Sequence, residues 1–123
     1  MTEHYAGVDV GSTTSKAVVI DGEGNVLARA LLPEGIGSTA GETVLHEVAR
    51  RSGTTVEGLT FTVATGYGRK IFPQSDRQVS ELSCHARGVA HVVPGVRTLI
   101  DVGGQDAKAM SITAEGIMTA FQM

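Results

Sequence analysis

An ungapped internal repeat is the feature that most constrains what this chain can fold into. Residues 9–28 align with residues 101–120 at an offset of 92 positions, and nine of the twenty aligned pairs are identical. Both copies carry Asp-Val-Gly, four further residues and Lys-Ala, followed later by Glu-Gly. A chance match between two ordinary glycine-rich hairpins is the weaker explanation, because the run has no gap. The repeat therefore predicts two related strand–turn–strand units.

Each copy has the composition of a phosphate-binding hairpin. Glycine after the first strand allows a tight turn and brings backbone N–H groups close to a ligand. An aspartate at the end of a strand is an oxygen ligand for Mg²⁺, and a lysine on the return strand adds positive charge for phosphate. The alternative is an aspartate that only caps its own turn. We expect two facing hairpins to bind the phosphates and the magnesium of one nucleotide.

The candidate site residues follow from this interpretation. Asp9 and Asp101 are expected to be metal ligands and catalytic carboxylates that point into one cleft. Lys16 and Lys108 either contact phosphate or are solvated strand residues. Neither copy has the pattern of a Walker A loop or of a Rossmann dinucleotide site. The other residues expected to bind the nucleotide are Gly11, Ser12, Thr13 and Thr14 in the first copy and Gly103, Gly104 and Gln105 in the second.

Strand and helix patterns alternate along the chain, which predicts an α/β fold. Alternating or β-branched apolar runs indicate strands, and apolar residues three or four apart indicate helices. Ser38 or Thr39 is expected to cap the first helix, which ends near Arg51. The second helix covers 83–93, with Ala86 and Val93 among its inward residues, and 78–82 is a short strand or the start of that helix. Strands are expected over 5–10, 16–20, 26–32, 59–64, 96–102, 108–112 and 117–121.

Composition and charge narrow the classes of function. The 123 residues fit one ordinary domain, and a net charge of −3 leaves no basic surplus for general nucleic-acid binding. No apolar run approaches the roughly 20 residues of a membrane span, and the N-terminal residues lack a signal-peptide pattern. We therefore expect a cytoplasmic protein without membrane contact. The single cysteine, Cys84, allows neither an internal disulfide nor a cysteine-only cluster within one chain.

Five segments resemble those of a known family. The duplicated Asp-x-Gly hairpin resembles that of the actin, sugar-kinase and heat-shock-chaperone ATPase superfamily. Within it, the sequence is similar to the ATP-dependent activators of 2-hydroxyacyl-CoA dehydratases and to the related ATPase subunits of benzoyl-CoA reductases. The segments are GVDVGSTTSKAVV, FTVATGYGRK, SELSCHARG, LIDVGGQDAK and TAFQM, and the resemblance covers nearly the whole chain.

The resemblance implies a fold and a division into lobes. It implies a ribonuclease-H-like, actin-like ATPase lobe with a mixed βββαβα(β) sheet and two helices on one core over residues 1–97. Residues 98–123 are then the first hairpin and strand of a second, truncated lobe, and we expect one face of their sheet to be uncovered. The family's [4Fe-4S] cluster is bound by cysteines that the resemblance places after Met123, so its ligands are absent from this sequence.

Glu81 is the third residue expected to be catalytic. In the superfamily that this chain resembles, a carboxylate or amide at this place orients the water that attacks the γ-phosphate. The alternative is a glutamate at a helix N-terminus, where the helix dipole favours it. Cys84 is expected to be a small buried apolar residue, and His85 and His91 to be solvated or capping residues rather than metal ligands.

The resemblance also implies a function. It implies an activator that uses ATP and Mg²⁺ to drive low-potential electron transfer to a dehydratase or reductase. Its implied partners are that enzyme, an electron donor such as ferredoxin or flavodoxin, and a second copy of the chain in a homodimer. A non-enzymatic, truncated nucleotide-binding module and a sugar- or acid-kinase-like phosphotransferase remain alternatives. We expect the isolated chain to bind ATP weakly, because the family's adenosine-binding residues come later. We expect it to hydrolyse ATP near background, because lobe closure needs a second lobe.

Overall fold

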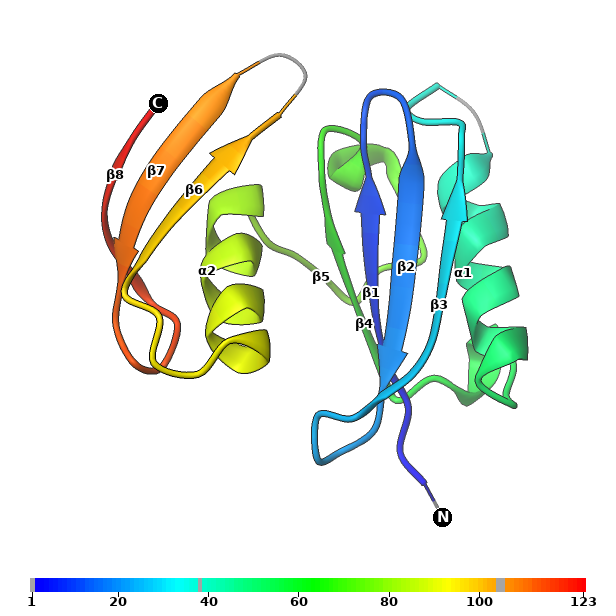
Figure 1. The fold of residues 1–123 in the computed structure, drawn as a ribbon. Coiled ribbons are helices and arrows are strands. Elements are labelled where there is room, and N and C mark those ends of the chain that lie inside the picture. Colours follow the sequence, from blue (N-terminus) through cyan, green and yellow to red (C-terminus); the bar gives the residue numbers. More distant parts are fainter. Residues whose placement is uncertain (1, 38, 104–105) are drawn as a thin grey trace. The chain divides into compact units, whose positions relative to one another are not determined.

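The chain is seen in a computed structural model that describes residues 2–37, 39–103 and 106–123. These residues form two compact units, of which the first ends at Val79 and the second begins at Ser80. In each unit, within the described residues, an α-helix packs against a β-sheet (Figure 1). The predicted α/β fold class is therefore confirmed.

The first unit contains a mixed sheet with the strand order β3-β2-β1-β4-β5. β1, β2 and β3 form an antiparallel meander, while β4 runs parallel to β1 and β5 runs parallel to β4. This mixture of directions is the one that the resemblance implies. The strands are β1 (Tyr5–Val10), β2 (Ser15–Ile20), β3 (Val26–Leu32), β4 (Phe61–Thr65) and β5 (Arg77–Gln78), with short 3₁₀ helices at Val56–Gly58 and Arg69–Ile71.

The helix α1 (Ala40–Arg51) covers one face of this sheet, because both elements have an apolar side. Val8 and Val10 of β1 point toward α1 and are buried with apolar residues of the helix, among them Leu45. Each fully buried valine or leucine side chain contributes about 1.5–3 kcal/mol to folding. Asp9 alternates with the two valines, so its side chain lies on the opposite face of the sheet.

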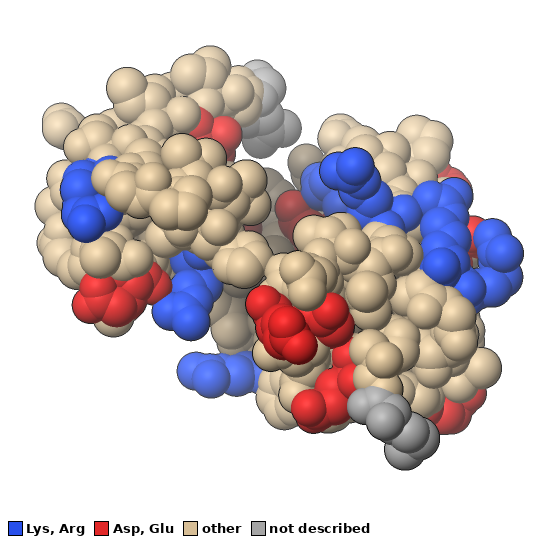
Figure 2. All heavy atoms as spheres, turned by 60° about the horizontal axis from the view of Figure 1, so that its bottom comes forward, with Lys and Arg blue, Asp and Glu red and all other residues tan. Residues whose placement is uncertain are grey.

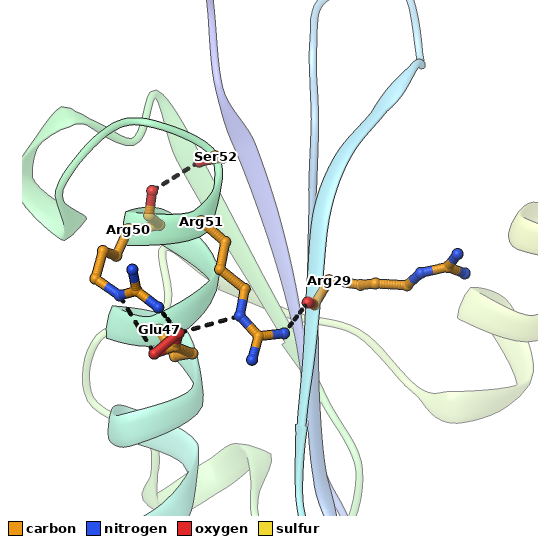
Figure 3. Close-up of polar contacts among 6 residues, drawn as sticks. Arg29, Glu47, Arg50, Arg51 and Ser52 are labelled. Carbon is orange, nitrogen blue, oxygen red and sulfur yellow. Dashed lines mark hydrogen bonds and ion pairs between the residues drawn. The ribbon is translucent and has the colours of Figure 1, made fainter.

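Charged residues at the C-terminal end of α1 attach the helix to β3 (Figure 3). Glu47 accepts hydrogen bonds from Arg50 and Arg51, and the bond from Arg50 lowers the pKa of the Glu47 carboxyl. Arg51 Nη1 also donates to the backbone oxygen of Arg29 at 2.7 Å. Because β3 is at the edge of the sheet, this contact fixes the outermost strand to the helix that covers it.

The second unit contains an antiparallel sheet with the order β6-β7-β8, and α2 packs on one face of it. The helix α2 (Glu81–Val92) begins after Ser80, whose hydroxyl accepts a hydrogen bond from the Ser83 N–H at 3.3 Å. Ala86 of α2 is buried with Met110 and Ile112 of β7. The strands are β6 (Thr98–Val102), β7 (Ala107–Ile112) and β8 (Met118–Gln122).

The position of α2 differs from the expectation of two helices on one core. The helix packs on the second sheet instead, because the small Ala86 allows close approach to the apolar side chains of β7. Met110 is therefore buried, whereas Val93, which was expected to point inward, is exposed beyond the end of α2. The lobe boundary at residue 97 stays a prediction.

Smaller differences concern the ends of elements. Thr39 is the N-cap residue of α1, but its side chain makes no capping hydrogen bond, and Ser38 lies outside the described residues. Cys84 is half-buried rather than buried. The strand expected over 59–64 begins and ends later, so Thr65 belongs to β4.

Charge is mixed on the face of the molecule that Figure 2 shows. Lysine and arginine side chains occur there together with aspartate and glutamate, and uncharged surface lies between the groups. This distribution agrees with the small net charge of −3. None of the helices in the described residues has the length and apolar character that crossing a membrane requires.

Candidate functional site

The two aspartates of the repeat lie directly opposite its two lysines. Asp9 of β1 pairs with Lys16 of β2, and Asp101 of β6 pairs with Lys108 of β7 in the same antiparallel register. The distance from Lys16 Nζ to Asp9 Oδ2 is 3.4 Å, and that from Lys108 Nζ to Asp101 Oδ2 is 3.3 Å. Each hairpin therefore holds a carboxylate and an ammonium group side by side at one point.

The glycine turns of the two copies also have the same hydrogen bond. The Gly11 N–H donates to the Thr14 oxygen at 2.9 Å, and the Gly103 N–H donates to the Asp106 oxygen at 2.8 Å. Equal register and equal turn bonds confirm that the repeat is a duplication of structure as well as of sequence. Gly104 and Gln105, which the sequence also assigns to the second loop, lie outside the described residues.

The first loop is held in place by the chain that follows β3. The Ile36 N–H donates to the Gly11 oxygen at 2.9 Å. A Cβ atom on Gly35 would lie 2.3 Å from the same oxygen, so only glycine lets the two segments approach this closely. Ser12 and Thr13 are exposed at the tip of the loop. The loop thus has a fixed backbone and hydroxyl groups that a ligand can reach.

The two lysines differ in their surroundings. The Lys16 side chain is 42% exposed and its Nζ also donates to Thr14 Oγ1 at 2.8 Å, whereas the Lys108 side chain is 14% exposed. Lys108 is therefore not the solvated strand residue that the sequence left as one alternative. Each ammonium group neutralises the charge of the carboxylate beside it.

His85 is a site residue that the sequence reasoning missed. Its Nδ1 lies 3.5 Å from Asp101 Oδ2, so it is a neighbour of the candidate metal ligand rather than a merely solvated residue. Glu81 precedes it by four positions on α2, which puts both side chains on one face of the helix. This spacing is the sequence signal that could have identified His85, because it places a titratable side chain beside the predicted catalytic glutamate.

Each hairpin by itself offers donors that suit magnesium and a polyphosphate. Magnesium sites in nucleotide-binding proteins use one or two carboxylates together with phosphate oxygens, and each unit supplies one carboxylate at a strand end, Asp9 in the first and Asp101 in the second. The Gly11 loop offers N–H and hydroxyl groups for the phosphates. A [4Fe-4S] cluster does not fit, because the sequence has one cysteine and the described residues contain no group of three metal-ligating side chains.

A family profile and similar known proteins indicate the same family for this chain. The sequence profile of the BadF/BadG/BcrA/BcrD ATPase family matches residues 6–123. The chain is 44% identical over 117 residues to an activator of lactoyl-CoA dehydratase from Anaerotignum propionicum, which covers 95% of this chain and 45% of the relative. It thus spans about half the length of the curated relatives that it matches.

Two solved structures share both the fold and the sequence pattern. Component A of the (R)-2-hydroxyglutaryl-CoA dehydratase of Acidaminococcus fermentans superposes with a TM-score of 0.90 at 40% identity, over 98% of this chain and 46% of the other. The activator of the 2-hydroxyisocaproyl-CoA dehydratase of Clostridium difficile, solved with bound ADPNP, gives 0.88 at 39% identity, over 97% and 44%. The expected actin-like ATPase fold is confirmed by these superpositions.

Proposed function

Because this chain belongs to the BadF/BadG/BcrA/BcrD ATPase family, we propose that it is the ATP-binding and ATP-hydrolysing part of an activator that drives low-potential electron transfer to a 2-hydroxyacyl-CoA dehydratase or a benzoyl-CoA-reductase-type enzyme. The observation that carries the proposal is the duplicated hairpin, in which an aspartate and a lysine are paired in the same register. The similarity to three dehydratase activators supports the choice of partner enzyme.

In this proposal the hairpins bind the charged end of ATP. Asp9 and Asp101 would hold the magnesium ion through their carboxylates, and the ammonium groups of Lys16 and Lys108 would bind phosphate oxygens. Backbone N–H and hydroxyl groups of the first loop bind phosphate, as do Gly103, Gly104 and Gln105 in the second. Magnesium supplies charge neutralisation of the phosphates.

Glu81 is the residue that we assign to hydrolysis. Water is a weak nucleophile, so its attack on the γ-phosphate needs a group that orients it and accepts its proton. The carboxylate of Glu81 stands on the same face of α2 as His85, which lies beside Asp101. If Glu81 has this role, loss of its carboxylate should lower the rate of ATP hydrolysis far more than the affinity for the nucleotide.

The partners follow from the activator function. The dehydratase or reductase receives the electron, and a ferredoxin or flavodoxin supplies it. The activator works as a homodimer in the cytoplasm, and residues 1–97 and 98–123 belong to its first and second lobe. Since Cys84 alone cannot hold a [4Fe-4S] cluster, no electron-transfer step is assigned to the residues of this chain.

A chimeric activator tests the proposal. The half of the lactoyl-CoA dehydratase activator that matches this chain is replaced by residues 1–123, and the dehydratase is assayed with ATP and titanium(III) citrate. We expect ATP-dependent activation with this chimera and none with a chimera that carries Asp9→Asn. Calorimetry shows whether the inactive chimera is still folded, through its melting transition.

Other outcomes favour the alternatives. ATP binding without hydrolysis or activation would indicate a nucleotide-binding module. Transfer of the γ-phosphate to a sugar or an organic acid would indicate a phosphotransferase. A chimera that is folded and binds no ATP would contradict the proposal as a whole.

A further inference from the structure

The end of β4 lies beside the first aspartate of the repeat. β4 runs parallel to β1, and Thr65, its last residue, is the register partner of Asp9. Thr62 and Ala64 are buried on the α1 side of the sheet, so Thr65 points to the other face, as Asp9 does. Both side chains therefore stand at the carboxyl ends of neighbouring parallel strands, where ligands of α/β proteins commonly bind.

The hydroxyl group of Thr65 is buried without a partner. Its Oγ1 accepts and donates no hydrogen bond in the part of the chain that the structure describes. Buried polar groups are nearly always paired, because a lone one gives up its hydrogen bonds to water without replacement. The unpaired Thr65 hydroxyl is therefore available to act on the neighbouring carboxylate of Asp9.

Gly66 brings the backbone across the same carboxylate. A Cβ atom at this position would lie 2.4 Å from Asp9 Oδ1, and the φ angle of Gly66 is +92°. Both the close contact and the positive φ angle therefore exclude a side chain here. The Gly68 N–H then donates to the Val10 oxygen at 2.8 Å, which fixes the segment to the end of β1. The segment 65–68 thus packs against Asp9. It belongs to neither of the two predicted phosphate loops.

We propose that Thr65 is a positioning residue for Asp9: its hydroxyl donates a hydrogen bond to the Asp9 carboxylate when that carboxylate holds the metal ion of bound ATP. The inference rests on the proposed function, since it concerns the same site. In the structure Lys16 Nζ lies 3.4 Å from one oxygen of this carboxylate, Asp9 Oδ2. When Lys16 turns to phosphate, the Thr65 hydroxyl keeps the carboxylate from rotating away from the metal.

The second hairpin positions its aspartate by another route. Among the described residues its sheet has the order β6-β7-β8, so no strand stands next to β6 as β4 stands next to β1. Asp101 is instead flanked by His85 of α2 and by the largely buried Lys108. The role proposed for Thr65 is therefore specific to the first hairpin.

Valine and serine at position 65 separate a positioning role from a structural one. Thr65→Val keeps the shape and removes the unpaired hydroxyl, so it should raise the midpoint of thermal unfolding. We expect the same variant to bind Mg-ATP about tenfold more weakly, which corresponds to one lost hydrogen bond to a charged group. In EDTA its affinity for ATP should change less than about twofold, because Asp9 then holds no metal. Thr65→Ser should restore Mg-ATP affinity.

Ser15→Ala is the matched control. Ser15 Oγ is also buried without a hydrogen-bond partner among the described residues, but Ser15 lies on the α1 face of the same sheet. Its removal should leave the affinity for Mg-ATP unchanged. Isothermal titration calorimetry of the chimeric activator, with wild-type residues 1–123 or with one of the three substitutions, measures all four proteins with magnesium and with EDTA.

The outcomes distinguish this inference from the proposed function. Wild-type binding of Mg-ATP with equal binding by Thr65→Val would overturn the inference and leave the proposed function standing. Equal weakening with magnesium and with EDTA, or weakening that serine does not restore, would assign Thr65 a structural role and would also overturn it. A folded chimera with wild-type residues 1–123 that binds no ATP would contradict the proposed function, and the inference with it.

Discussion

Val8 of the first hairpin and Ile100 of the second are equivalent residues of the repeat, yet Val8 is 1% exposed and Ile100 is 72% exposed. Val10 and its equivalent Val102 differ in the same way. In the first unit α1 covers this face of the hairpin, whereas in the second unit α2 covers the face that carries Leu99 and Met110. The same hairpin is therefore packed from opposite sides in the two units.

The comparison shows that the geometry of the aspartate–lysine pair does not depend on which face of the hairpin the helix covers. The aspartate–lysine distances agree within 0.1 Å, since they are 3.4 and 3.3 Å, although one pair is on the face opposite α1 and the other is beside α2. Register and turn hydrogen bonds, which are local, are enough to set this geometry. The packing of a helix adds or removes neighbours without changing the pair.

The largest difference between the hairpins is expected for a charge on their equivalent apolar residues. Val8→Asp places an unpaired carboxylate under α1 and should cost about 4 kcal/mol, or abolish folding of the first unit. Ile100→Asp, on the exposed face, should cost about 1 kcal/mol or less. Urea unfolding followed by circular dichroism measures both. Equal losses would mean that the Ile100 face is covered in solution.

Removal of either carboxylate charge tests whether the hairpins act on one ligand. Asp9→Asn and Asp101→Asn should each weaken Mg-ATP binding by about tenfold to a hundredfold, which is about 1.4–2.7 kcal/mol. Binding of ATP in EDTA should not weaken, because the lost charge repels phosphate. Titration calorimetry with both variants checks this. A loss in one variant alone would restrict the metal site to that hairpin.

The lysines should differ in their contribution to stability. Lys108→Met should lower the free energy of unfolding by about 1 kcal/mol, because the Lys108 side chain is largely buried where it meets its carboxylate partner. Lys16→Met should lower it by about 0.5 kcal/mol or less, since that pair is well exposed and screened. Thermal unfolding of the two variants at equal salt concentration gives the comparison. The reverse order would show that burial does not govern these pairs.

The far turns of the hairpins should respond differently to acid. Gly24 and Gly116 donate equivalent turn bonds at 3.1 and 3.0 Å, to the backbone oxygens of Asp21 and Thr113. A hydrogen bond from the Asn25 backbone N–H is the main cause of the lowered pKa of Asp21, whereas the Thr113 hydroxyl, which accepts from the Ile117 N–H, does not titrate.

A carboxylate with a lowered pKa stabilises its turn above its ordinary pKa and loses this effect as the pH falls through the lowered value. As the pH falls below the ordinary pKa of an aspartate, amide exchange at Asn25 should therefore accelerate beyond the intrinsic pH dependence, and that at Ile117 should not. Asp21→Asn serves as the control, because it removes the titration. Equal acceleration at both turns would indicate general acid unfolding.

Much of this architecture could be predicted from the order of residues alone. The alternation of Val8, Asp9 and Val10 separates a buried face from a polar one, and the glycine turn sets the register that pairs Asp9 with Lys16. The duplicated pattern extends both conclusions to Asp101 and Lys108. These features involve residues that are close in the chain or joined by one tight turn, so their geometry follows from local sterics and hydrogen bonding.

The neighbours of the site could not be predicted in the same way. Thr65 meets Asp9 only because β4 returns parallel to β1, and His85 meets Asp101 only because α2 packs on the second sheet. The apolar stripe of α2, with Ala86 at its centre, predicts that the helix is buried but not against which sheet. Long-range burial decides that choice, because the hydrophobic effect is non-directional and rewards any apolar surface that the helix can cover.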